Sequence, residues 1–131
     1  MDERVEPLWI RLHPLLDVFA RQVAESHPGL RARVDGSAND VFLLRAHAAF
    51  IKSSNGDEIA ISVDVIPKGT AIGITSDLCT DKGEILAVGP GAEFPLSEIS
   101  SLAANSDWLR RFRQFLSDVE PQVRARASML G

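Results

Sequence analysis

Hydrophobic residues near the start of the chain recur at intervals of three or four, which places them on one face of an α-helix. Proline lacks an N–H, and Pro14 would clash with the carbonyl of Ile10, so this helix is expected to kink there or to restart. Pro28-Gly29 is a stop signal. The pattern predicts an amphipathic helix over about residues 4–27, with a buried face of Val5, Leu8, Leu12, Leu16, Phe19 and Val23.

Between Leu30 and Phe94 the hydrophobic period changes to two, and β-branched residues become more frequent. This pattern indicates strands. Every connection between the runs is too short to hold a crossover helix, so neighbouring strands should pair antiparallel. The expected turns are Asp35-Gly36, Asn55-Gly56, Pro67-Lys68-Gly69 and Asp81-Lys82-Gly83.

The helical period returns after Pro95. A short helix is expected over 97–104, followed by a longer helix capped by Asn105 or Ser106 that bends or restarts near Pro121. Its apolar face is Trp108, Phe112, Phe115, Leu116, Val119 and Val123. Residues 1–131 are therefore predicted to form a single α+β domain, in which an antiparallel β-meander of about five strands is flanked by N-terminal and C-terminal amphipathic helices.

The run from Val41 to Ile51 is largely apolar on both of its alternating faces. A sheet with one wet face would show polar residues on that face. Two arrangements would explain the run: the helices cover opposite faces of the sheet, or they cover one face and the other face meets a partner. We favour the second arrangement, with another protein or a second copy of the chain as the partner.

Composition limits the classes of protein. The 131 residues include one cysteine, Cys79, so an internal disulfide and a cysteine-built zinc site are excluded. Asp2, Glu3 and Glu6 stand where a secretory signal would be basic, and no apolar run approaches the length of a membrane span. These features favour a cytoplasmic protein, without membrane contact.

Charge is unevenly distributed around a net value of −4. Residues 57–107 hold nine acidic and two basic groups, whereas residues 108–131 hold two acidic groups and five arginines. The acidic region would repel nucleic-acid phosphate and attract a basic protein. The arginines alternate with apolar positions, as on the wet face of a helix. Nucleic acid is therefore not an expected partner.

The chain contains few candidates for chemistry. Cys79 and His47 could form a nucleophile and base if they met, but a small apolar filler at a strand end is the better interpretation of Cys79. Three carboxylates surround the turn from Asp77 to Glu84, where a solvated turn is favoured over a cation site because EF-hand spacing is missing. Gly89-Pro90-Gly91 lacks the residues of a phosphate loop and is predicted to be a turn. No cofactor or metal is expected.

The order of helix, meander and helix, together with small size and acidity, resembles that of small acidic bacterial accessory proteins, including immunity proteins and secretion-chaperone-like domains. The chaperone pattern has a helix between its strands, and the tight turn at 67–69 leaves no room for one. The uneven charge and the strand that is apolar on both faces favour a non-enzymatic protein-binding domain, and the resemblance, at the level of fold, is to proteins of that type. The alternative is a small-molecule-binding protein or enzyme, with a pocket between sheet and helices made by Gly73, Ala46, Ala48 and Ala60. The residues predicted to bind protein are Arg45, His47, Asp64, Asp77 and Asp81.

Overall fold

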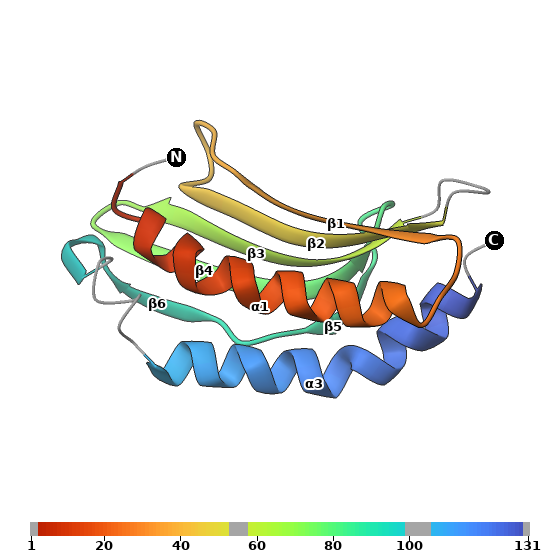
Figure 1. Cartoon of the computed structure of the whole chain (residues 1–131). Helices are drawn as coiled ribbons and strands as arrows, with labels where there is room; N and C mark the ends of the chain where they lie inside the picture. Colours follow the sequence, from red (N-terminus) through yellow and green to blue (C-terminus); the bar gives the residue numbers. More distant parts are fainter. Residues whose placement is uncertain (1–2, 53–57, 99–105, 130–131) are drawn as a thin grey trace.

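The computed structural model describes residues 3–52, 58–98 and 106–129. Along the chain, the strands follow one long helix and precede another, as Figure 1 shows. The elements are α1 (Glu6–Glu25), β1 (Leu30–Ser37), β2 (Leu44–Lys52), β3 (Glu58–Lys68), β4 (Ala71–Thr80), β5 (Ile85–Val88), β6 (Ala92–Pro95), the 3-10 turn η1 (Leu96–Glu98) and α3 (Ser106–Met129).

The strands form one antiparallel sheet in the order β1-β2-β3-β4-β5, and β6 also pairs with β4. The short strands β5 and β6 pair with different parts of β4, from Asp77 to Cys79 and from Ala71 to Ile74 respectively. The predicted α+β fold, an antiparallel meander between two terminal helices, is confirmed.

Both helices lie on the same side of the sheet (Figure 1), α1 against β1 and β2 and α3 beside α1 and over β3. Between them and the sheet lies the hydrophobic core. Alternate residues of the central strands point into it and are fully or almost fully buried: Leu44, Ala46, Ala48, Phe50, Ile59, Ile61, Val63, Val65, Ile72, Ile74 and Leu78. Of the two arrangements that the sequence left open, the structure has the one with a single helix-covered face.

Each long helix contains one proline beyond its first turn. The helix α1 continues through Pro14, and α3 continues through Pro121 and bends toward its C-terminal end (Figure 1). Tertiary packing compensates for the missing helical hydrogen bonds, because the apolar residues on both sides of each proline are buried in one core. The expected turn Asn55-Gly56, the N-cap residue Asn105 and most of the predicted 97–104 helix fall outside the described residues.

Asp35-Gly36 was predicted as a turn, and this was wrong, because β1 continues through both residues to Ser37. The glycine has a packing role instead. A Cβ atom on Gly36 would lie 2.9 Å from Cη2 of Trp9, so the absence of a side chain lets the indole of α1 rest on the strand.

Gly89-Pro90-Gly91 lies between β5 and β6 and holds that edge of the sheet against α3. The hydroxyl of Ser76, which is 3% exposed, donates to the Pro90 carbonyl over 2.7 Å. The indole N–H of Trp108 donates to the same carbonyl over 3.3 Å. A Cβ on Gly89 would come within 2.9 Å of the Phe115 ring, so glycine is required for this close approach.

Within the described part of the chain, neither helix combines the length and apolarity needed to cross a membrane.

Candidate protein-binding face

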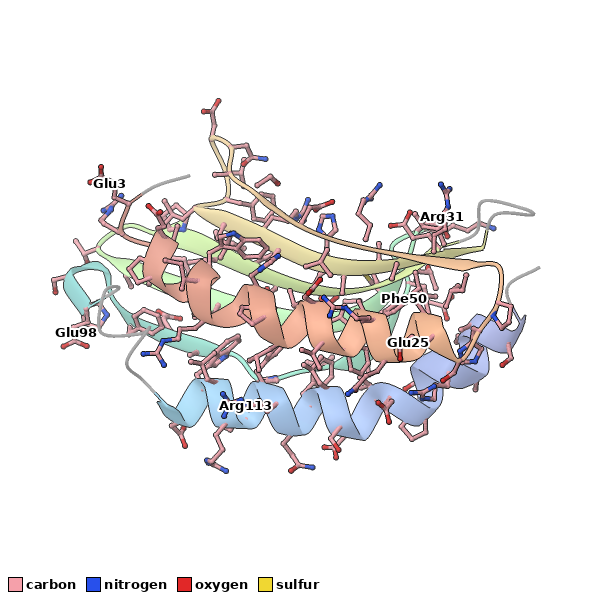
Figure 2. All side chains as sticks on the ribbon, in the orientation of Figure 1. Glu3, Glu25, Arg31, Phe50, Glu98 and Arg113 are labelled. Atoms are coloured by element: carbon pink, nitrogen blue, oxygen red, sulfur yellow. The ribbon has the colours of Figure 1, made fainter. Side chains whose placement is uncertain are left out.

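The face of the sheet opposite the helices is not covered by the described part of this chain. We call this surface the open face. Figure 2 shows Arg31, from β1, on the side away from the helices and Phe50, from β2, among the core side chains. From the pairing registers, the open face is formed by Arg31, Arg33, Asp35, Arg45, His47, Ala49, Ile51, Glu58, Ala60, Ser62, Asp64, Thr75, Asp77 and Cys79.

Arg45 and Asp64 are directly opposite each other on β2 and β3. Nε of Arg45 donates to Oδ1 of Asp64 over 3.0 Å, and the guanidinium carbon lies 3.9 Å from the centre of the Phe42 ring. The cation–π contact and the ion pair together fix the direction of the arginine. Its side chain remains 47% exposed, so a partner can still reach it.

A second set of paired side chains lies on β1 and β2. Oδ2 of Asp35 forms a salt bridge with Nε of Arg33 at 3.0 Å, and Oδ1 lies 2.8 Å from Nε2 of His47, the cross-strand neighbour of Asp35. The carboxylate therefore sets the orientation of the imidazole ring. Asp35 was predicted to lie in a turn, so its position beside His47 was not expected.

Next to these pairs the open face is hollowed. The depression has a volume of about 230 Å³ and is lined by Arg45, His47, Glu58, Ala60, Ser62, Cys79, Thr80 and Asp81. It exists because the residues at its floor, Ala60, Ser62 and Cys79, are small, whereas longer side chains surround them. A hollow with an apolar and hydroxyl floor and a charged rim can accept one side chain of another protein.

Two groups beside this hollow have perturbed acidity. Partial burial raises the pKa of Asp77, with a further increase from the negative charge of Asp64, although hydrogen bonding to Cys79 and the charge of Arg45 act in the opposite direction. Burial also raises the pKa of the Cys79 thiol, and the carboxylates of Asp77 and Asp64 add to the increase. Both shifts indicate a partly dehydrated site with negative potential.

These shifts argue against nucleophilic chemistry. Cys79 and His47 line the same hollow, but they stand on the non-adjacent strands β4 and β2, with Ala60 and Ser62 of β3 between them. A raised pKa leaves the thiol protonated, whereas a catalytic cysteine needs its thiolate. Ser62 lies 3.8 Å from the sulfur and supplies no base.

The turn between β4 and β5 was the other candidate for chemistry. Among the residues that the structure describes, no three His, Cys, Asp or Glu side chains are arranged to hold a metal ion.

The structure places the five predicted protein-binding residues in one region. Arg45, His47, Asp64 and Asp77 are on the open face, and Asp81 follows β4 at the rim of the hollow. Reasoning from sequence missed three further residues of this region: Asp35, Arg33 and Ser62. The alternation of β3 and β4 contained the signal for Ser62, which stands on the same strand face as Asp64.

The predicted small residues do not form a single pocket. Ala46 and Ala48 point into the core and are fully buried, whereas Ala60 and Gly73 are on the opposite face of the sheet. A separate groove of about 430 Å³ lies between the two helices, lined by Pro14, Leu15, Val18, Phe19, Gln22, Leu116, Ser117 and Glu120.

Comparisons of the chain with protein-family models, with curated proteins and with solved structures found no match.

Proposed function

We propose that the chain is a non-enzymatic protein-binding domain and that the open face is its docking surface. The observation that carries the proposal is the placement of both helices on one side of the sheet, which leaves the other side to be covered by something else. Four of the residues expected to bind protein lie on that uncovered side.

The composition of the open face supports a protein partner. Its charged groups are held in fixed directions by the pairs Arg45–Asp64 and Asp35–His47, so they would lose little side-chain entropy on binding. Arginine and paired charges around a small dehydrated hollow are typical of specific protein interfaces.

The shallow form of the hollow and the protonated state of the Cys79 thiol favour binding over catalysis. A pocket enzyme needs a concave site with a polarised reacting group. On the open face the groups that could react are paired with one another or hold their proton.

The test is affinity capture from the native host with matched variants of the purified protein. Ser62→Trp places an indole in the hollow of the open face, and Ser117→Trp places the same side chain in the groove between the helices. We expect wild type and Ser117→Trp to retain the same identified protein and Ser62→Trp to lose it. The proposal is wrong if Ser62→Trp retains that protein and Ser117→Trp does not, provided both variants melt cooperatively near the wild-type temperature.

A further inference from the structure

The charges on the open face are separated into two sides. The half of the face formed by β1 and β2 has three arginines and one carboxylate, which is already bonded to Arg33 and His47. The half formed by β3, β4 and the following turn is acidic. The residues concerned are Arg31, Arg33, Arg45 and Asp35 on the basic side, and Glu58, Asp64, Asp77, Asp81 and Glu84, against Lys68 and Lys82, on the acidic side.

We propose that the open face binds a second copy of this chain. The two copies are related by a two-fold axis that lies between the two open faces, parallel to the strands and above the boundary between β2 and β3. The inference rests on the proposed function and names its partner. A rotation about such an axis lays the basic side of each chain over the acidic side of the other. Opposite charges meet in the rows that contain Arg31 and Arg45, whereas the row of Asp35, His47 and Ser62 places Asp35, which is paired within its own chain, over the partner's Asp77.

The registers identify the contacts that this symmetry brings together. Arg31 pairs with Ile51, Ile51 pairs with Glu58, and the N–H of Asp81 donates to the Glu58 carbonyl over 3.1 Å. These residues therefore form one row across the sheet. Rotation about the axis brings Arg31 over the partner's Asp81 at one end of that row.

A second row gives the same result near the axis, because Arg45 and Asp64 are direct neighbours on its two sides. Rotation places Arg45 over the partner's Asp64, and the reciprocal contact follows from the symmetry. Because two packed sheets cross at about 30°, the charges should match between the basic and acidic sides of the face rather than between individual pairs of atoms.

The centre of the face permits close approach. Ala49 is fully buried and Ala60 is 9% exposed, although both are on the open face. Small residues there allow two sheets to pack at the usual separation of about 10 Å.

The area also fits a dimer. Strands of 8 to 11 residues, at a rise of about 3.3 Å and a spacing of about 4.8 Å, give a face of roughly 600 Å² in plan. Side chains increase its accessible area above that value. A stable interface of standard size buries about 800 Å² on each partner.

The experiment is a charge exchange, followed by light scattering after size-exclusion chromatography of the full chain. One variant reverses the basic side (Arg31→Glu with Arg33→Glu), and the other reverses the acidic side (Glu58→Lys with Asp81→Lys). We expect wild type to be dimeric. We expect each variant alone to raise the dimer dissociation constant by at least about ten-fold, because like charges then face each other.

An equimolar mixture of the two variants should form a heterodimer, since each reversed side then meets its opposite charge. The matched control, Arg111→Glu with Arg113→Glu, changes two exposed arginines of α3 and should leave the dimer intact. Sodium chloride should weaken the wild-type dimer, and this measurement needs no variant.

The outcomes separate this inference from the proposed function. A wild type that stays monomeric at high concentration, or a dimer that neither reversal disturbs, overturns the self-association proposed here. In either case, a captured protein that is lost only with Ser62→Trp would leave the proposed function standing. If the wild type is monomeric and Ser62→Trp does not change which proteins are captured, both the self-association and the proposed function are wrong.

Discussion

In the strands β2 and β3, alternate residues of the same segments form two different surfaces. On the helix side, positions 44, 46, 48 and 50 of β2 are fully buried. On the open face, the intervening positions hold Arg45 and His47 beside the fully buried Ala49. The helices cover the first set, whereas Ala49 is buried on the face that neither described helix covers.

This difference shows that burial in this sheet is not limited to the face that packs against the helices. The helix side is held by large apolar side chains packed against α1 and α3, and it determines the free energy of folding. The open face holds small residues and paired charges that contribute little to stability and are available for recognition. Substitutions on the two faces should therefore differ in both size and kind.

The largest effect is expected for Phe50→Ala, which removes a fully buried ring that lies 6.0 Å from the ring of Phe19. We expect a loss of about 3–5 kcal/mol in the free energy of unfolding, from lost burial and the cavity left behind. At the adjacent position, the half-buried Ile51 lies on the open face, and Ile51→Ala should lower the free energy of unfolding by about 1 kcal/mol. Urea unfolding monitored by circular dichroism measures both, and equal costs would contradict the assignment of the two faces.

Gly89→Ala should have the next largest effect. Its Cβ would press on the Phe115 ring and on the Ser76 hydroxyl that binds the Pro90 carbonyl. We expect a cost of about 1–3 kcal/mol from this overpacking, and a smaller cost for Gly91→Ala, whose nearest neighbour is the Ile74 carbonyl at 3.2 Å. Thermal unfolding ranks the two variants, and a larger cost at Gly91 would contradict this account of the edge.

The Arg45–Asp64 pair should contribute much less to stability. A double-mutant cycle with Arg45→Ala and Asp64→Ala should give a coupling energy of about 0.2–1 kcal/mol, because the arginine is nearly half exposed. The same substitutions should weaken binding more than they weaken folding. A coupling well above this range in the isolated chain would mean that the pair is structural.

The smallest effect is a dependence on pH. The folded-state pKa of Asp77 is raised, chiefly by burial. The stability that its protonated form provides is present below the unfolded-state pKa and is lost as the pH rises through the folded-state pKa. Asp77→Asn should therefore stabilise the chain at neutral pH, and this gain should vanish in acid.

Asp107→Asn is a control for which the dependence of stability on pH should have the opposite sign. Hydrogen bonding to Arg110 lowers the pKa of Asp107, so that carboxylate contributes stability above its unfolded-state pKa and loses it as the pH falls. Unfolding measured from pH 3 to pH 8 would show opposite trends for the two variants. Parallel trends would contradict the difference between the two environments.

Much of this fold could be predicted because period and turn chemistry are local properties. The apolar spacing of 5–23 and the alternation of 59–65 identified a helix and a strand directly. Asp35-Gly36 misled the prediction because a glycine beneath Trp9 has the same sequence appearance as a glycine in a turn. Only the tertiary contact with α1 distinguishes the two.

The candidate site was predictable in part. Alternation along β2 predicted Arg45 and His47 on one face, and the register places Asp64, expected near an acidic turn, opposite Arg45 on that face. The sequence could not decide which face the helices cover, because the apolar run of β2 includes both the core-facing Phe50 and the open-face Ala49. That choice depends on how α1 and α3 pack, which is a long-range property.

The most direct test of the open face as a binding surface is the rate at which Cys79, the only cysteine, is alkylated as protein concentration increases at constant pH. The thiol lines the hollow, so a second chain on the open face would shield it. We expect the rate per molecule to fall for wild type over the concentrations at which dimers form, and to stay constant for Arg31→Glu with Arg33→Glu. A constant rate for wild type that light scattering shows to be dimeric would place the interface elsewhere and contradict the account.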